Sequence, residues 1–538
     1  MDWIKDTFAW YFVILILGFI FFPLTKKIFN KFVDKGYPLS KTLAILIVTY
    51  IVYVLGSLKI SIFNSPQIAG LVSLIFAGSL FFLKEKNSKL TSLNIKFIII
   101  EEILFIFSLF LYTYIRGQQP AIHGLEKFMD FGIINSILRS NYFPPADIWF
   151  SGHTINYYYF GHLVTALLIK ITNIKASIGY NLMLTTIFAL SMTSAFTICI
   201  NLINVFKKVK FFALFSYGLL GTLIVNLSGN LHTIYLFTSG YPNDHPIPFW
   251  KILSSFTPEK YWYPNATRFI PFTIHEFPAY SYTVADLHGH VLDIPFVLLT
   301  IAFLFLFFVL IKKSDNVFKK SHYFTFIGFL ISAMYMTNAF DGPIYLLLAL
   351  FIFLTIFGFS NKFFIGTGIT LLSTYIFSLP FTSNFNAFVT GIGINCPPLF
   401  LSNIKKLGPF IFEAGNCQPT PVWMLFILWG FFLISFVTFI FIKLRTSIRN
   451  KSDDFVLLLM LISTIFILIP EFFYVKDIYP AHFRANTMFK LGYQAFIMMS
   501  IASLFVLFRL NSLTKWKNIL KGIYVILISF ILIYPYFS

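Results

Sequence analysis

Repeated long runs of apolar residues, with few charges inside them, constrain this chain more than any other feature of its sequence. Many of these runs reach ~17–25 residues, the length that a helix needs to cross the core of a bilayer. A transmembrane barrel would instead show ~10-residue segments of alternating polarity. With 58% hydrophobic and 11% charged residues, against about a quarter charged in soluble domains, the sequence predicts an all-α polytopic protein of the cell membrane.

We expect about 14 transmembrane helices, because each apolar run is bounded by charges or by Pro and Gly. Their predicted ranges are 8–22, 41–58, 66–83, 97–115, 178–204, 211–227, 291–311, 323–340, 343–358, 363–380, 421–442, 454–470, 488–508 and 518–535. The first run lacks a basic start and a small-residue cleavage site, so we expect a retained helix. We divide the chain into N-terminal transmembrane helices (1–96), a transmembrane core with external loops (97–510) and a C-terminal helix (511–538).

The segment 157–171, which begins with three tyrosines, decides the predicted topology. If it is interfacial or re-entrant and not a full span, the short basic loops all lie on one side, which the positive-inside rule places in the cytoplasm. These loops lie at 26–41, 84–96, 207–210, 312–320, 362, 443–451 and 509–521. We adopt this arrangement, because the segment is short and aromatic rings with polar tips suit the headgroup level. The outer face then carries the loops 116–177, 228–290, 381–420 and 471–487.

The net charge of +19 follows from these basic loops, so we expect no nucleic-acid partner. The chain has three cysteines. Cys199 lies in an apolar run and is expected to be inert packing. Cys396 and Cys417 share one polar loop, and an external position would allow them to pair.

The first outer loop holds an amphipathic segment with acidic residues at its start. From Asp130 to Arg139 apolar residues recur with helical spacing, which predicts a helix lying on the membrane. Plain capping would account for Asp130 alone, since a carboxylate stabilises the first turn of a helix. Glu126 lies one turn earlier and Asp147 follows in a Pro-flanked turn. Acids gathered in one loop favour a general base or a metal ligand, so we predict these three as catalytic residues.

Two further polar groups lie at helix boundaries. Asp286, His288 and His290 have a spacing that is compatible with a divalent metal, and the alternative is a hydrogen-bonded helix start. Asn338 and Asp341 lie at a Gly–Pro break between two apolar runs, where a tight turn of Asp-Gly type is the alternative to a functional role.

The segment 471–490 crowds ionisable residues around the start of an otherwise apolar helix. Ionisable groups at membrane depth are costly and are therefore usually functional. Arg484 and Lys490 are suited to grip a phosphate, Arg by a bidentate fork. The alternative is that these cations snorkel and anchor the end of the helix.

The run "MDFGIINSILRSNYFPPADIWFSGHTINYYYFGH" resembles the signature of the YYY membrane-protein family (Chlor_Arch_YYY), a domain of unknown function found in archaea and some bacterial phyla. The blocks "ADLHGHVLDIPF", "TNAFDGPIY" and "RANTMFKLGYQ" are also similar to that family. The resemblance covers roughly residues 95–510. It names a family without implying an activity.

A more distant resemblance, to GT-C class glycosyltransferases of the protein mannosyltransferase type, implies a function. Those enzymes have an external loop with an acidic pair at its start, followed by a Pro- and Tyr-rich patch and a short amphipathic helix. Asp130 matches the start of the loop, and the segments 144–159 and 163–171 match the patch and the helix. This chain departs from that pattern because no acid follows Asp130 directly and four predicted spans precede the loop.

The resemblance implies transfer of a sugar from a polyprenyl-phosphate donor at the external face. Asp130 would deprotonate the acceptor hydroxyl, supported by Asp147 or Glu126, and Arg268, Arg484 and Lys490 would bind the lipid phosphate. The predicted substrate-binding residues are Asn156, Tyr157, Tyr158, Tyr159, His162, Asp286, His288, His290, Asn338 and Asp341. The expected partners are membrane lipids and the donor, while the acceptor and any cofactor other than a divalent metal at Asp286, His288 and His290 stay open. The alternatives are a lipid or solute transporter or flippase and a non-catalytic envelope protein.

Overall fold

A computed structural model describes the chain except for residues 1, 84–89 and 447–449. Parts of the predicted basic loops 84–96 and 443–451 therefore lie outside the described residues. The chain divides into two compact units. Unit 1 comprises residues 1–218 and 285–386, and unit 2 comprises residues 219–284 and 387–538.

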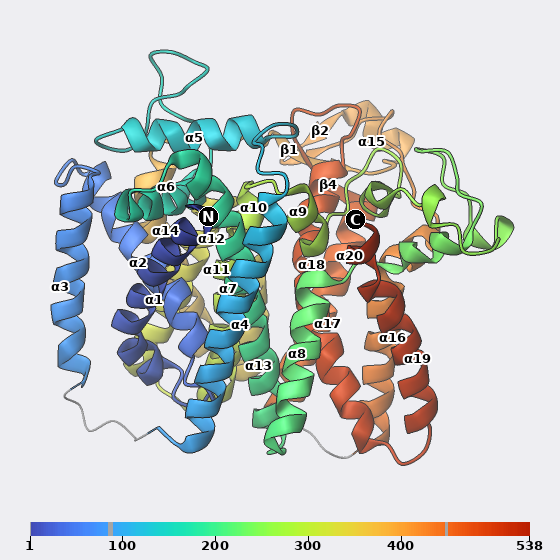
Figure 1. Ribbon diagram of the computed structural model, residues 1–538. Helices are drawn as coiled ribbons and strands as arrows, with labels where there is room; N and C mark the ends of the chain where they lie inside the picture. The colour runs from blue at the N-terminus through green and yellow to red at the C-terminus, as the bar shows by residue number, and fades with distance from the viewer. Residues whose placement is uncertain (1, 84–89, 447–449) are drawn as a thin grey trace. The chain divides into compact units, whose positions relative to one another are not determined.

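Unit 1 is built from long helices that lie side by side (Figure 1). They are α1 (Asp2–Ile28), α2 (Tyr37–Ser57), α3 (Ser65–Leu83), α4 (Ser92–Gly117), α7 (Ala176–Phe206), the first part of α8 (Phe211–Leu227), α11 (Ile294–Leu310), α12 (Ser321–Thr337), α13 (Asp341–Phe357) and α14 (Asn361–Thr382). Glycine lets two of them approach closely, because a Cβ on Gly328 of α12 would meet the backbone oxygen of Thr370 in α14 at 2.6 Å. Small residues at helix contacts are the usual packing device in membranes.

Three short helices complete unit 1, two of them in the predicted first outer loop and the third at the end of the second. They are α5 (Lys127–Arg139), α6 (Phe160–Thr172) and α10 (Gly289–Leu292). Helix α5 runs across the ends of the long helices (Figure 1), as expected of the predicted amphipathic helix. Helix α6 has 13 residues, about 20 Å at 1.5 Å per residue, which is too short to cross a core of ~30 Å. The tyrosine triplet precedes it, so the prediction that this segment is not a full span is confirmed.

Twelve of the 14 predicted apolar ranges each lie on one helix, to within about three residues at the ends, and the ranges 291–311 and 518–535 each extend over two successive helices. The described residues contain eight helices that are long and apolar enough to cross a membrane by length and composition. The number is nine if α8 and the bent continuation Leu231–Phe237 form one span. Shorter apolar helices include Ile294–Leu310 and Asp341–Phe357. The prediction of a helical, multi-pass protein is confirmed, and the count of 14 stays a prediction.

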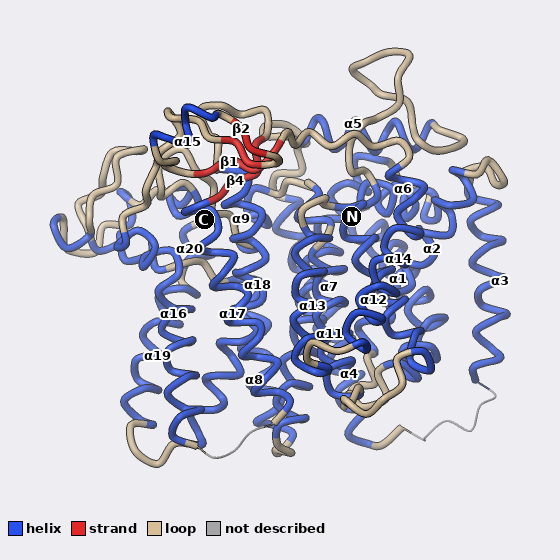
Figure 2. The backbone as a smooth tube through the Cα atoms, turned by 180° about the vertical axis from the view of Figure 1, so that it is seen from behind, coloured by secondary structure: helices blue, strands red, loops and turns tan. Residues whose placement is uncertain are grey.

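Unit 2 combines long helices with irregular segments and a small sheet (Figure 2). Its helices are the end of α8, α9 (Pro278–Val284), α15 (Leu399–Ile404), α16 (Val422–Arg445), α17 (Lys451–Phe472), α18 (Ala485–Arg509), α19 (Lys517–Leu532) and α20 (Tyr534–Phe537). Short 3-10 turns fill much of the segment 231–267.

The sheet is a departure from the all-α prediction. Its four strands have the order β2-β3-β1-β4, formed by β1 (Gly391–Ile394), β2 (Lys406–Leu407), β3 (Phe410–Ile411) and β4 (Phe473–Lys476). Strand β1 runs antiparallel to β4 and parallel to β3. Position 393 has to be glycine, because a Cβ there would lie 2.0 Å from the Tyr474 ring. The strands are so short that no alternating pattern reveals them in the sequence.

Candidate functional site

The candidate site lies in unit 1 and begins with two acids at the start of α5. Glu126 is the residue that precedes the helix, and Asp130 lies in its first turn. Residues four apart share one face of a helix, so both carboxylates point the same way. Asp130 is fully buried, with 0% of its side chain exposed, whereas 54% of the Glu126 side chain is exposed. The two predicted catalytic acids therefore have opposite environments.

Asp130 contacts a histidine and not the backbone of its own helix. The Nε2–H group of His162, in the first turn of α6, donates a hydrogen bond of 2.7 Å to Asp130 Oδ1. Both side chains are fully buried. Helix α6 can bring His162 this close because residue 161 is glycine: a Cβ there would lie 2.7 Å from Leu292 Cβ of α10. Plain capping, the alternative interpretation of Asp130, is not what this side chain does.

His288, which is distant from the two acids in the sequence, lies beside both of them. Its Nδ1 atom lies 3.0 Å from Glu126 Oε2 and 3.7 Å from Asp130 Oδ1. Its Nε2 atom is 3.0 Å from the hydroxyl oxygen of Tyr157. Residue 289 must be glycine, because a Cβ would lie 2.6 Å from the backbone oxygen of Thr337. Three segments separated along the chain thus meet around one imidazole.

The charges of this cluster fix its protonation. Burial alone would lower the pKa of His288, but the neighbouring carboxylates of Asp130 and Glu126 outweigh burial and raise that pKa well above its usual value. Burial alone would raise the pKa of Asp130, but the hydrogen bond from His162 and the nearby His288 outweigh burial and lower that pKa. His288 is therefore a cation at neutral pH and Asp130 is its buried counter-charge.

The three tyrosines of the predicted patch do different things. The rings of Tyr157 and Tyr158 lie 3.9 Å apart between centroids, and both lie near the His288 ring, at 6.0 and 6.3 Å. Burial, followed by the neighbouring Tyr158 and the two acids, raises the pKa of Tyr157 well above its usual value, so it stays a phenol. Tyr159 turns away and packs against Tyr53, with 3.4 Å between the hydroxyl oxygens. Only the first two tyrosines belong to the site.

The possible metal site does not assemble. Among the residues that the structure describes, no group of three or more His, Cys, Asp or Glu side chains is arranged to hold a metal ion. Asp286, His288 and His290 are buried, but the His288 nitrogens face Glu126 and Tyr157. The sequence spacing suggested ligands because it takes no account of where each ring points.

Asn338 and Asp341 form the tight turn that was the alternative to a functional role. Asn338 follows the last residue of α12, and Asp341 is the first residue of α13. The amide of Asn338 donates a hydrogen bond of 2.8 Å to Asp341 Oδ2, and the Asp341 N–H donates to the Asn338 carbonyl at 2.9 Å. This pair fixes the connection between two helices.

Two other predicted residues support the backbone instead of the cluster. Asp147 Oδ1 accepts hydrogen bonds of 2.8 Å from the N–H groups of Trp149 and Phe150, which is a local turn motif. The side-chain amide of Asn156 exchanges two hydrogen bonds, of 2.8 and 3.1 Å, with the backbone of Asn386. The contacts of Asp147 and Asn156 therefore favour a structural role in holding a loop over the catalytic and binding roles predicted for them.

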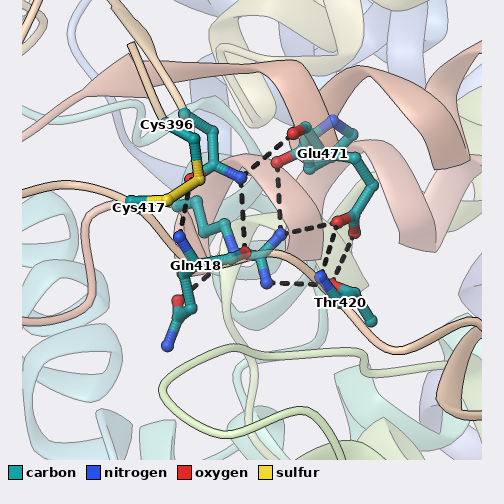
Figure 3. The surroundings of a disulfide bond; sticks show 8 residues. Cys396, Cys417, Gln418, Thr420 and Glu471 are labelled. Atoms are coloured by element: carbon teal, nitrogen blue, oxygen red, sulfur yellow. Dashed lines mark hydrogen bonds and ion pairs between the residues drawn. A yellow bond between two sulfur atoms is a disulfide. The ribbon is translucent and has the colours of Figure 1, made fainter. Parts of the chain in front are cut away.

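Arg484 of unit 2 is neither a snorkelling cation nor an open phosphate grip. Its side chain is 0% exposed and pairs with Glu471 at 3.0 Å between Nη1 and Oε2. It also donates hydrogen bonds to Thr420 Oγ1 at 2.9 Å and to Gln418 Oε1 at 3.3 Å. Glu471, Gln418 and Thr420 gather beside the disulfide between Cys396 and Cys417 (Figure 3). The guanidinium therefore ties the start of α18 to the disulfide-closed segment.

Cys396 and Cys417, whose pairing the sequence left open, form this disulfide; an external loop would allow it to persist, because disulfides are stable in oxidising compartments. Cys199 is buried and free. The other two predicted phosphate-binding residues also lie in unit 2. Arg268 has a 38% exposed side chain and pairs with Glu276 at 3.0 Å, while Lys490 is buried beside the Phe489 ring. Their phosphate role stays a prediction.

The sequence interpretation missed a buried polar group among the long helices of unit 1. Thr197 Oγ1 lies 2.8 Å from Glu101 Oε1 and 2.9 Å from Asp34 Oδ2, and all three side chains are buried. Close by in sequence, Glu102 pairs with buried Lys41. The signal was available, because two adjacent acids inside the predicted span 97–115 are unusual at membrane depth.

The long apolar helices define a helical, multi-pass membrane protein. The chain belongs to the family described as "Uncharacterized membrane protein (DUF2298)", whose profile matches residues 47–452 and 437–499. Neither a curated protein nor a solved structure matches the chain. The match begins earlier in the chain than the resemblance to the YYY family does, and the resemblance to the GT-C class stays a prediction.

Proposed function

We propose that this protein is a glycosyltransferase that uses a polyprenyl-phosphate sugar as donor at the external membrane face. One observation carries the proposal: segments around residues 126–130, 157–162 and 286–290 assemble a cationic histidine, a buried carboxylate and a half-exposed carboxylate. Such a set of titratable groups with opposed environments is typical of acid–base chemistry. Its place beside α5, across the ends of the long helices, suits a substrate held at the bilayer surface.

Glu126 is the better candidate for the general base than Asp130. Asp130 is fully buried, and its lowered pKa makes it a weak base. Glu126 is half-exposed and within 3.0 Å of His288, so an acceptor can reach it. In the proposed step Glu126 takes the proton of the acceptor hydroxyl, the acceptor oxygen bonds to the anomeric carbon, and the bond from that carbon to the lipid phosphate breaks. The products are a glycoside and polyprenyl phosphate.

The other members of the cluster are positioning residues in this scheme. Asp130 and His162 hold each other and fix the ring of His288, whose positive charge orients the Glu126 carboxylate. Tyr157 and Tyr158 place two adjacent, tilted aromatic rings beside it, and aromatic faces suit sugar rings. A nucleotide is not required, because the sugar–phosphate bond of the donor supplies the driving force.

The test is a transfer assay on purified protein in proteoliposomes, with radiolabelled polyprenyl-phosphate sugars and a panel of acceptors. We expect Glu126→Gln to lower transfer about 10²–10⁴-fold, the usual contribution of a general base. Glu259→Gln removes an exposed acid from the second outer loop and serves as the matched control, with unchanged transfer. Full activity of Glu126→Gln, or no transfer by the wild-type protein with any donor, would overturn the proposal.

A transport function is the second candidate, and the buried group of Asp34, Glu101 and Thr197 favours it. Buried carboxylates among membrane helices often mark proton or ion paths. Proteoliposomes with a fluorescent lipid in the inner leaflet measure flipping directly. Flipping that is lost in Glu101→Gln but kept in Glu126→Gln would support transport over sugar transfer.

A further inference from the structure

Unit 1 contains a second candidate binding site, at the opposite end from α5. A cavity of about 330 Å³ lies between the α1–α2 connection, the start of α4 and the junction of α7 with α8. Helix α4 has 26 residues and is therefore about 39 Å long. The cavity lies at the first turn of α4, and the segment that leads to α5 begins at its last turn. The cavity is therefore distinct from the Glu126–His288 cluster.

The lining of the cavity combines three lysines with apolar side chains. Lys31 and Lys35 come from the α1–α2 connection, and Lys208 from the α7–α8 junction. Asn94 and Asn204 are the other polar lining residues. All remaining lining side chains are apolar, Phe211 among them, and within the described residues that line the cavity there is no acid. The positive-inside rule accounts for lysines at the predicted cytoplasmic end of these helices. It does not account for the gathering of three lysines around one cavity whose other walls are largely apolar.

The nearest acid does not neutralise these lysines fully. Asp34 lies next to Lys35 in the chain, but its carboxylate is buried and holds Thr197 and Asn201 at 2.9 and 2.7 Å. Partial burial is the largest cause that lowers the pKa of Lys35; Asp34 opposes this effect, and the neighbouring lysines Lys26, Lys208 and Lys31 add to it. Like charges held together in this way favour an anion between them.

The start of α4 adds a second source of positive potential. Asn94 belongs to a capping box with Thr91, in which the Asn94 side chain accepts from the Thr91 N–H at 2.8 Å and the Thr91 hydroxyl accepts from the Asn94 N–H at 3.2 Å. The first turn of this long helix is therefore rigid where it lines the cavity. Helix N-termini favour anions, phosphate above all.

We propose that this cavity binds the phosphate headgroup of an anionic membrane phospholipid, with Lys31, Lys35 and Lys208 around the phosphate. The half-apolar lining suits the glycerol and upper acyl region of a lipid, which a soluble phosphate lacks. Basic pockets between helices on the cytoplasmic side are typical of such lipids. The inference is independent of sugar transfer.

The experiment compares lipid binding by the purified full chain in detergent, measured by native mass spectrometry and by thermal stabilisation. The probes are phosphatidylglycerol, phosphatidylcholine and inorganic phosphate. The variant is Lys31→Gln/Lys35→Gln/Lys208→Gln. The control is Lys312→Gln/Lys313→Gln/Lys319→Gln, which removes the same charge from exposed positions of another basic loop of unit 1.

We expect phosphatidylglycerol to bind and stabilise the wild-type protein, and phosphatidylcholine to do so far less. Each lysine near a headgroup contributes about fivefold in affinity, so the cavity variant should bind about a hundredfold more weakly. The single variant Lys208→Gln should show the fivefold loss if the triple variant folds poorly. Equal losses in the cavity variant and the control would overturn the proposal, and equal stabilisation by inorganic phosphate would overturn the lipid assignment.

Discussion

Replacing Asp130 by Asn and Glu126 by Gln should separate stability from catalysis. Each change keeps the size of the side chain and removes its charge. Asp130 is 0% exposed and accepts a bond of 2.7 Å from His162, and a hydrogen bond to a charged group contributes ~1.5–3 kcal/mol. The variant also takes the counter-charge away from cationic His288. We therefore expect Asp130→Asn to lower the free energy of unfolding by about 2–3 kcal/mol, below the ~3–5 kcal/mol of a buried pair that is broken outright.

Glu126 should behave differently although it contacts the same histidine. Its side chain is 54% exposed, and exposed ion pairs contribute only ~0–1 kcal/mol because water screens them. We expect Glu126→Gln to change the free energy of unfolding by less than about 1 kcal/mol while sugar transfer is lost. Asp130→Asn should reduce transfer as well, in proportion to the fraction of His288 that is left uncharged.

The assay is reversible unfolding in mixed micelles of SDS and a mild detergent, followed by tryptophan fluorescence, together with the transfer assay on the same preparations. Glu259→Gln controls for the loss of an exposed acid and should change neither quantity. The reasoning is refuted if the two variants lose the same stability. It is also refuted if Glu126→Gln, and not Asp130→Asn, proves to be the destabilised protein.

Three other outcomes follow from the structure. Because the pKa of His288 is raised in the folded state, the contribution of this residue to stability is complete below about pH 6.5. The contribution is lost as the pH rises through the pKa that His288 has in the folded protein. The difference in melting temperature between the wild-type protein and His288→Gln should therefore narrow at alkaline pH. Gly289→Ala places a Cβ 2.6 Å from a backbone carbonyl oxygen, so thermal scans should show destabilisation and transfer assays a loss of activity beyond that of an Ala substitution at an open glycine such as Gly368. Arg484→Met leaves the Glu471 carboxylate without its 3.0 Å ion pair and should cost ~3–5 kcal/mol in micelle unfolding, whereas Arg484→Met combined with Glu471→Leu should recover most of it.

Sequence periodicity predicts the elements of this protein well because each element is long or strongly amphipathic. The apolar runs lie on helices, and the segment beginning at Asp130 lies on α5. The short tyrosine segment is also predicted correctly, since its 13-residue helix reflects the length of its apolar run. The small sheet is missed because its strands have two to four residues, too few for a pattern.

The candidate site is predicted only in part, for a physical reason. Sequence spacing shows which polar residues are close along the chain, but the cluster depends on how three segments meet. Asp147 and Asn156 lie in the same loop as the site, yet both hold backbone groups. Arg484 was expected near an anion because it is a cation at a helix start; its partner Glu471 lies 13 residues earlier and reaches it through the turn after α17. Burial and direction of a side chain are properties of packing, and packing is not visible in spacing.

Glu126 and Asp130 carry the same chemical group one helical turn apart, but the two carboxylates have different environments. Both face His288, but Glu126 lies before the first residue of α5, where solvent reaches it, and Asp130 lies over the ends of the packed helices, where α6 covers it. Two imidazole neighbours outweigh desolvation and keep the inner carboxylate an anion, while the outer carboxylate lies where an acceptor can reach it. The lengths of the two side chains match these places. Glu126→Asp would withdraw the carboxylate by one methylene from its 3.0 Å contact, and Asp130→Glu would force an extra methylene into a site with no exposed surface. We therefore expect neither exchange to preserve activity, although both keep the charge, and only the second to lower stability.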